Sequence, residues 1–167
     1  MTGIEVREER PEDLSAIRRI HERAFPEPDE ANLVDRLRQD GDIVLALVAT
    51  AGDEPVGHIV FSRLLLADPA VKATALAPVS VLPERQRQGI GSALIVEGLA
   101  KLRDAGEDVV LVLGDPAYYS RFGFLTQAAK AFRSVYEGPY FQSIPFTDAG
   151  RFAHGEVTYP RAFAALG

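Results

Sequence analysis

The chain has 167 residues, of which 47% are hydrophobic and 25% are charged, with a formal net charge of −6 and no cysteine. This composition is typical of a globular protein, and the length suffices for one domain that buries roughly two thirds of its unfolded surface. The lack of cysteine excludes a disulfide framework, a thiolate metal site and a cysteine nucleophile, while the acidic balance argues against a nucleic-acid partner.

The N-terminal half is predicted to begin with a strand and two helices and to continue with three strands. Alternating apolar residues indicate the strands, and apolar residues at helical spacing indicate the helices. The predicted elements are a strand around Ile4 and Val6, helices over 11–25 and 29–40, and strands over 43–49, 56–66 and 74–81. We expect Asp29 to cap the second helix. Pro78, inside the last strand, indicates a sheet edge or a bulge, because proline donates no ladder hydrogen bond.

The C-terminal half is predicted to add helices and strands in turn. The predicted elements are a helix over 92–105, a strand over 109–113, a short helix over 116–122 and a strand-rich remainder with a last strand around Val157. The strand over 109–113 is a continuous apolar run, as expected for a strand buried on both faces. The sequence therefore predicts a single mixed α/β domain over residues 1–167, with a central sheet flanked by helices.

A glycine-rich turn separates the strand over 74–81 from the helix that follows. Its residues Gly89-Ile90-Gly91 lie where backbone N–H groups at a helix start bind phosphate, and glycine allows a ligand close to the backbone. The absence of Gly-Lys-Ser or Gly-Lys-Thr excludes a P-loop. Ala93 and Leu94 follow instead of the late glycine of a dinucleotide fingerprint. A different phosphate-bearing cofactor is therefore expected.

Two segments together match the pattern of a known family. Residues 86–91 have the form [RQ]-x-x-G-x-G/A, and residues 119–124 have the form Y-x-[KR]-x-G-F, beginning at Tyr119. In this order and at this distance they resemble the GNAT acetyltransferase superfamily, in particular its small bacterial predicted N-acetyltransferases. The resemblance covers residues 4 to about 124 and implies the GNAT-like acyl-CoA N-acyltransferase fold, with a mixed, mostly antiparallel sheet.

The resemblance implies a site for acetyl-CoA as a co-substrate, without a metal. The pantetheine arm would lie along the strand before the turn, and the pyrophosphate would meet the turn and the helix start. The implied cofactor residues are Val79, Ser80, Val81, Gln86, Arg87, Gln88, Gly89, Ile90, Gly91, Ser92 and Tyr119. Tyr119 is implied as the general acid that protonates the CoA thiolate, since a phenol is a neutral donor at pH 7. Tyr118 points roughly 100° away on a helix and is expected to pack.

The general base is the least determined part of the predicted site. The resemblance implies either a glutamate near the centre of the sheet or a water chain, and the matching strand over 109–113 holds no acid. Asp115 is the first candidate, although Asp-Pro before a short helix also predicts a helix cap. His58 is the second candidate, and its alternative is a satisfied strand histidine. His21 and His154 have no supporting context.

The acceptor is expected to bind where two strands separate, between the loop at 25–29 and the C-terminal segment. Glu27, Asp29 and Glu30 either attract a cation there or form a solvated acidic loop. Tyr136, Tyr140 and Phe141 either line the pocket or belong to the core.

We expect an N-acetyltransferase that moves the acetyl group of acetyl-CoA to a primary amine, carried by a small molecule or a peptide. Two alternatives stay open: an acyltransferase with a longer acyl donor or a protein acceptor, and a CoA-binding sensor without turnover. No apolar run approaches the roughly 20 residues that cross a bilayer, and the polar N-terminus is unlike a secretory signal. These features predict a cytoplasmic protein, monomeric or homodimeric, with no membrane or nucleic-acid partner.

Overall fold

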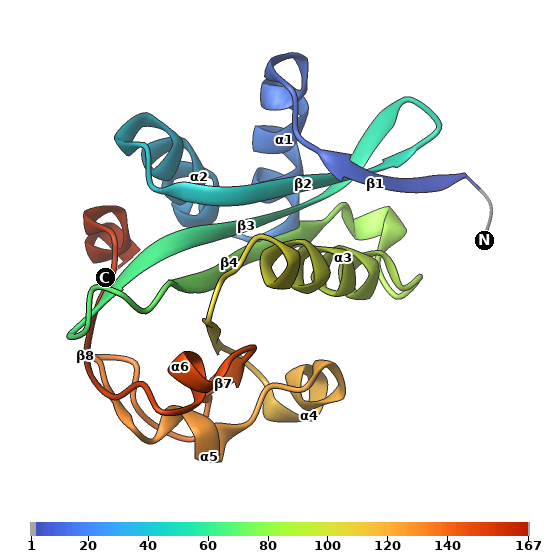
Figure 1. The fold of residues 1–167 in the computed structure, drawn as a ribbon. Coiled ribbons are helices and arrows are strands. Elements are labelled where there is room, and N and C mark those ends of the chain that lie inside the picture. Colours follow the sequence, from blue (N-terminus) through green and yellow to red (C-terminus); the bar gives the residue numbers. More distant parts are fainter. Residues whose placement is uncertain (1–2, 167) are drawn as a thin grey trace.

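A computed structural model describes residues 3–166, drawn as a ribbon in Figure 1. Short 3-10 turns at 11–13, 83–85, 120–122 and 161–166 supplement the helices and strands. The helices and strands are β1 (Ile4–Glu8), α1 (Leu14–Ala24), α2 (Asp29–Asp40), β2 (Ile43–Ala51), β3 (Glu54–Leu66), β4 (Ala73–Val81), α3 (Ile90–Asp104), β5 (Val109–Leu113), α4 (Pro116–Tyr119), α5 (Thr126–Ala129), β6 (Phe132–Arg133), β7 (Phe141–Pro145), α6 (Asp148–Arg151) and β8 (Gly155–Thr158).

One sheet runs through the molecule in the strand order β1-β2-β3-β4-β5-β7. Neighbouring strands pair antiparallel except β4 and β5, which run parallel. β8 pairs with the end of β3 and with β6, which brings the C-terminal segment back against the sheet. The predicted mixed, mostly antiparallel sheet flanked by helices is confirmed.

Apolar side chains are buried on both faces of the sheet, because helices cover each face. α1 and α2 lie on one face and α3 lies on the other (Figure 1). Adjacent side chains of β2 point to opposite faces of the sheet, as in any strand. Val48 belongs to the core cluster that includes α2, and Leu47 belongs to the cluster that includes α3. α3 approaches β3 closely at Gly98, where a Cβ atom would collide with the ring of Phe61.

β4 and β5 separate partway along β4. Their parallel ladder joins Ala73–Leu76 to Val109–Val112, and β4 continues to Val81. The pairing of β4 with β3 shifts register at this point, so that β4 carries an extra residue next to Pro78. Pro78 therefore lies in a bulge of a central strand, not at a sheet edge, and the sheet opens between the two strands where the bulge begins.

Most of the predicted elements are present, with small shifts in their bounds. The expected cap of α2 differs, because Asp29 is the first helical residue and Pro28 takes the N-cap position. The short helices α5 and α6 of the C-terminal segment were not predicted. Each has four residues, too few to show a helical repeat in the sequence.

Candidate active site

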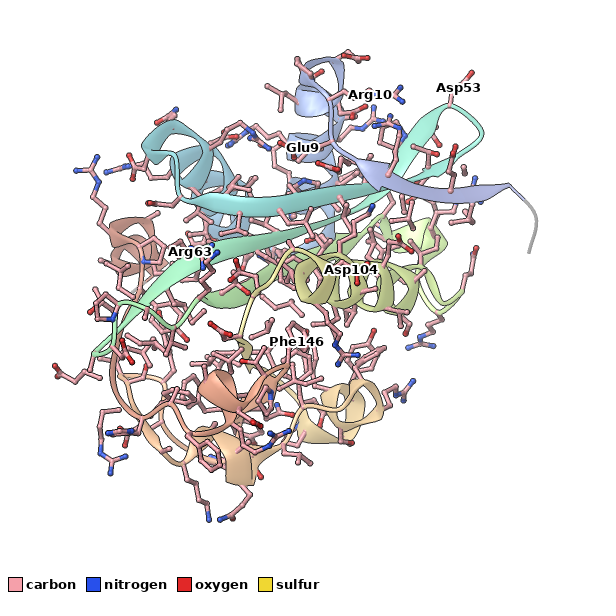
Figure 2. The ribbon with its side chains drawn as sticks, viewed as in Figure 1. Glu9, Arg10, Asp53, Arg63, Asp104 and Phe146 are labelled. Carbon is pink, nitrogen blue, oxygen red and sulfur yellow. The ribbon has the colours of Figure 1, made fainter. Side chains whose placement is uncertain are left out.

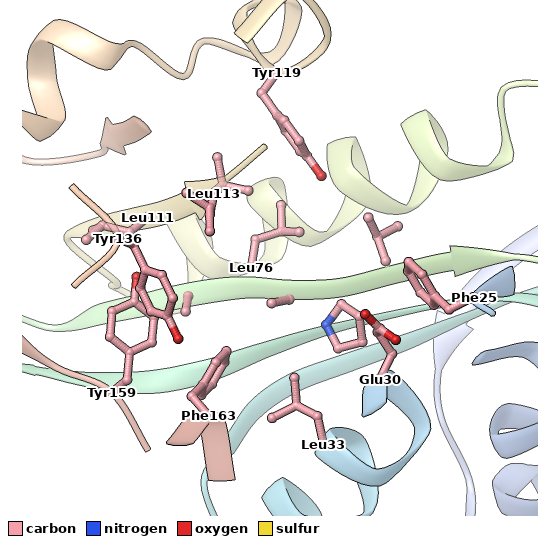
Figure 3. Close-up of a pocket in the computed structure, with 15 residues that line it drawn as sticks. Phe25, Glu30, Leu33, Leu76, Leu111, Leu113, Tyr119, Tyr136, Tyr159 and Phe163 are labelled. Atoms are coloured by element: carbon pink, nitrogen blue, oxygen red, sulfur yellow. The ribbon is translucent and has the colours of Figure 1, made fainter. Parts of the chain in front are cut away.

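The opening between β4 and β5 leads into a cavity of about 440 Å³, here called the reaction cavity. Figure 3 shows the side chains that line it. They come from the opened strands, from the end of α1 and the first turns of α2, from α4 and from the C-terminal segment. The lining residues are Phe25, Glu30, Leu33, Ala75, Leu76, Ala77, Pro78, Val79, Leu111, Val112, Leu113, Tyr119, Tyr136, Tyr159 and Phe163. These described residues are largely apolar, and Glu30 is the single carboxylate among them.

A second cavity, of about 510 Å³, surrounds the glycine turn and is here called the loop cavity. Its lining residues are Val79, Val81, Arg85, Gln86, Arg87, Gly89, Ile90, Gly91, Ser92, Tyr118 and Arg121. Val79 of β4 lines both cavities. A long ligand along β4 would thus extend from the glycine turn into the reaction cavity.

The backbone of the glycine turn is shaped to bind an anion. Arg87 and Gly89 both have positive φ angles, of 65° and 81°, and such alternation turns N–H groups toward a common point. The first hydrogen bond of α3 runs from the Ala93 N–H to the Gly89 carbonyl at 3.0 Å, so the N–H groups of residues 90–92 have no partner within the helix. The helix dipole adds to the attraction for phosphate. The residues present therefore fit the pyrophosphate of a coenzyme A.

Not every predicted cofactor residue lines a cavity. The Gln88 side chain donates to the Glu84 carbonyl at 3.4 Å. Ser80 is buried on the face of β4 opposite to Val79 and Val81. Gln86 lines the loop cavity while its side chain donates to the Val81 carbonyl at 3.0 Å, which braces the turn. The other predicted residues line one cavity or the other.

The two consecutive tyrosines serve different cavities. The Tyr118 hydroxyl lies 3.2 Å from Ser92 Oγ, and the Arg121 guanidinium lies over the Tyr118 ring. Tyr118 was expected only to pack, but it lines the loop cavity. Tyr119 instead points its hydroxyl into the reaction cavity (Figure 3). Its ring lies against Gly114, where a Cβ atom would collide with it.

Tyr119 is a neutral donor at any physiological pH. Burial, assisted by the neighbouring Tyr118, raises the pKa of Tyr119 to about 12. The phenol therefore keeps its proton and presents it to whatever occupies the reaction cavity.

The structure shows which of the acidic and aromatic candidates from the sequence line the reaction cavity. Asp115 is exposed, lies outside the reaction cavity and accepts the Ala117 N–H at 2.9 Å, which is the helix-cap arrangement. Glu27 and Asp29 are exposed and also lie outside this cavity, whereas Glu30 lines it. Of the C-terminal aromatic residues, Tyr136 lines the cavity, Tyr140 is exposed and Phe141 is in the core.

A chain of buried polar side chains, here called the histidine relay, runs behind β4. His21 of α1 lies between two partners, with Nδ1 2.6 Å from Ser80 Oγ and Nε2 2.8 Å from His58 Nδ1. His58 Nε2 lies 2.8 Å from the Glu9 carboxylate, which also accepts hydrogen bonds from Arg38. Glu9 follows β1 on the face covered by α1 and α2 (Figure 2).

The direction of every hydrogen bond in the relay follows from the Glu9 carboxylate. An ionised carboxylate only accepts, so His58, neutral because burial lowers its pKa, donates from Nε2 and accepts at Nδ1. His21 must then donate from Nε2 and accept at Nδ1, where the Ser80 hydroxyl donates. Both imidazoles are neutral in this pattern. Burial lowers the pKa of His58, and burial together with the neighbouring His58 lowers that of His21 to about 3.

The relay was not predicted as a unit, although part of it left a signal in the sequence. His21 lies on the same helical face as Ile17 and Ile20, and all three are buried. A histidine on an apolar helix face needs a partner. Those partners, His58 and Ser80, are 37 and 59 positions away, so spacing along the chain does not identify them.

The arrangement suits the transfer of a group from a phosphate-bearing carrier to a second molecule. The loop cavity supplies an anion site, and the described residues of the reaction cavity supply an apolar space with three phenols and one carboxylate. Within residues 3–166, no group of three or more His, Cys, Asp or Glu side chains is arranged so that it could hold a metal ion. None of the described helices is long and apolar enough to cross a membrane.

The family model and the similar proteins that match this chain are all described as acetyltransferases. Residues 5–126 match the family model described as acetyltransferase (GNAT) domain. The chain is 37% identical over 134 residues to the uncharacterized N-acetyltransferase YhbS of Escherichia coli K12, covering 80% of each protein. It is 40% identical over 118 residues to the uncharacterized N-acetyltransferase YjhQ of the same strain, covering 67% of this chain and 64% of YjhQ.

Two solved structures have closely similar folds. The GNAT family N-acetyltransferase YhbS from Escherichia coli, in complex with CoA, has a TM-score of 0.91 and 34% identity, covering 98% of this chain and 93% of that one. A GNAT family acetyltransferase from Brucella melitensis, in complex with acetyl-CoA, has a TM-score of 0.82 and 39% identity, covering 96% and 97%.

Proposed function

Because the chain belongs to the GNAT acetyltransferase family, we propose that it transfers the acetyl group of acetyl-CoA directly to a primary amine, with Tyr119 as the general acid. The observation that carries this proposal is the pair of cavities that share Val79. One surrounds an anion-binding turn, and the other holds the Tyr119 hydroxyl. A carrier that spans both would present its thioester to the phenol.

The residues of the loop cavity hold the donor. The N–H groups at the start of α3 and the guanidinium of Arg87 bind the pyrophosphate, and the opened edge of β4 from Val79 to Val81 receives the pantetheine arm as an added strand. These contacts fix the thioester near the point where β4 and β5 separate.

The reaction needs no covalent bond to the protein. The amine nitrogen forms a bond to the acetyl carbon, the carbon–sulfur bond breaks with its electron pair on sulfur, and the nitrogen loses one proton to water. The Tyr119 hydroxyl, aimed into the cavity, donates its proton to the departing sulfur and is later reprotonated from water. The apolar lining excludes bulk water and strengthens this hydrogen bond.

The proposal is tested by calorimetry with acetyl-CoA and by the release of free CoA thiol in the presence of amines. We expect acetyl-CoA to bind and primary amines to accelerate thiol release. The N,N-dimethyl form of the same amine gives no acceleration, because it cannot form a stable amide. Binding without any amine-dependent release contradicts the proposal and supports the sensor alternative. Absence of binding contradicts both.

We expect Gly91→Ala to weaken acetyl-CoA binding without weakening the fold. A Cβ atom at Gly91 meets only ordinary contacts, 3.5 Å from the Tyr118 hydroxyl and 3.9 Å from Val81, but it projects into the loop cavity where the phosphate approaches the backbone. The dissociation constant should rise by about tenfold or more, a loss of roughly 1.4 kcal/mol. Calorimetry measures the affinity, and thermal unfolding measures the stability.

Gly98→Ala on the same helix is the control, because it should lower stability and not affinity. Its Cβ atom collides with Phe61 in the core, so this variant loses stability and, while folded, keeps its affinity for acetyl-CoA. Equal affinity of Gly91→Ala and the unmodified protein would contradict the placement of the pyrophosphate.

A further inference from the structure

Glu30 is an unusual member of the reaction cavity. Among the described lining residues it is the only carboxylate, since the others are apolar or phenolic, and it is partly buried. No side chain in the described part of the chain forms an ion pair or hydrogen bond with it. Figure 3 shows its carboxylate at the start of α2, across the cavity from the Tyr119 hydroxyl. A partly buried carboxylate in this position favours a cation as its partner.

An aromatic wall of three rings from the C-terminal segment closes the other end of the cavity (Figure 3). Tyr136 and Tyr159 have ring centroids 4.8 Å apart, and Tyr159 and Phe163 have centroids 5.1 Å apart, both pairs edge to face. Burial raises the pKa of Tyr136 and Tyr159, so both phenols are neutral. Such rings bind an aromatic or apolar body by burial and by edge or face contacts.

The lining also selects against negative charge. Arg, Lys and His are absent from the described residues that line the cavity. A carboxylate or phosphate beside the acceptor amine would lie unpaired in an apolar space and near Glu30, which is costly. The volume of about 440 Å³ is toward the low end for small-molecule sites, which favours a small acceptor.

We propose that the acceptor is a primary amine on a small aromatic or apolar body without a negative charge. Glu30 binds the ammonium form of this amine, which loses one proton to water before the neutral nitrogen attacks the thioester. The aromatic wall of Tyr136, Tyr159 and Phe163 binds the body of the acceptor. This inference rests on the proposed acetyl transfer and specifies the class of amine that the reaction uses.

Three primary amines test the aromatic wall and the exclusion of negative charge separately. Phenethylamine carries an amine on an aromatic body, phenylalanine adds a carboxylate, and 1,3-diaminopropane replaces the ring by a second charge. Thiol release from acetyl-CoA should give phenethylamine a kcat/KM at least tenfold above those of the other two. A kcat/KM for phenylalanine or diaminopropane equal to or above that of phenethylamine overturns the inference and leaves the proposed function intact. If none of the primary amines accelerates thiol release, the proposed function itself fails.

Glu30→Gln tests the ammonium site while keeping the shape of the side chain. We expect the KM for phenethylamine to rise about tenfold or more, because a charge-assisted contact becomes a neutral one, and the KM for acetyl-CoA to stay unchanged. Glu27→Gln removes an exposed charge just before α2 that lies outside the cavity, and it should leave both constants unchanged. A phenethylamine KM unaffected by Glu30→Gln, or changed equally by Glu27→Gln, overturns the assignment.

Discussion

Tyr119→Phe should lower kcat by about 10²–10⁴-fold while leaving acetyl-CoA binding unchanged. The substitution removes one hydroxyl and keeps the ring that packs against Gly114 and Phe124. The sulfur then leaves as a thiolate in a largely apolar cavity without the proton that Tyr119 would donate. Single-turnover measurement of thiol release, with calorimetry for donor affinity, separates the chemical step from binding.

The raised pKa of Tyr119 gives this prediction a pH signature. The active form of the phenol is the protonated one, and a pKa of about 12 keeps that form present throughout the alkaline range used in assays. Burial raises the pKa of the phenol, and it also raises the pKa of a thiol released next to it. The difference between the two pKa values therefore changes little. Tyr140→Phe, at an exposed tyrosine, is the control and should keep full activity. A Tyr119→Phe rate within threefold of the control would contradict the acid role.

His58→Ala should destabilise the protein by about 3 kcal/mol or more, because it cuts the histidine relay at its centre. The variant leaves a cavity and deprives both Glu9 and His21 of a hydrogen-bond partner. For a protein of this length the loss corresponds to a fall of about 6–12 °C in Tm. His154→Ala, at an exposed histidine, should stay within about 0.5 kcal/mol of the unmodified protein. Equal stabilities of the two variants in urea unfolding would show that the relay contributes nothing.

The relay also predicts how stability depends on pH. The pKa values of His21 and His58 are lowered in the folded state, so the unfolded chain takes up protons first as the pH falls below about 6.5. Their contribution is complete above that pH and is lost progressively below it. The charged groups around the pair are Glu9, Arg38 and Asp13.

Acid unfolding between pH 7 and pH 5 tests this dependence. Although burial raises the pKa of Glu9, hydrogen bonds from His58 and Arg38 lower it overall, so Glu9 adds to the loss only below about pH 4.5. His58→Gln removes one titrating group and should reduce the slope of unfolding free energy against pH by up to about 1.4 kcal/mol per pH unit. A slope identical to that of the unmodified protein would contradict the neutral form of His58.

What the sequence predicts well is contained in short stretches. The strand, turn and helix from Val79 to Leu94 are adjacent in the chain, so their order alone indicates a phosphate site. Tyr119 belongs to a second local motif, and the structure places it in the reaction cavity. Pro78 indicated either a sheet edge or a bulge. Because β4 pairs with a strand on each side, the structure shows the bulge.

What the sequence misses depends on contacts between distant segments. Glu30 and Asp29 are neighbours with the same charge, and only the packing of α2 against the opened sheet distinguishes them. Each residue of the aromatic wall resembles an ordinary core residue when taken alone. The relay joins β1, α1, β3 and β4, and no local pattern connects these four elements.

The aromatic wall lies entirely beyond residue 126, where the match to the family model ends. The loop cavity, by contrast, is built from residues 79–121, inside the matched part. Under the proposed function, the residues that hold the donor and most of those that choose the acceptor therefore occupy separate stretches of the gene. Substitutions in the C-terminal segment would then change the accepted amine and leave the donor site untouched.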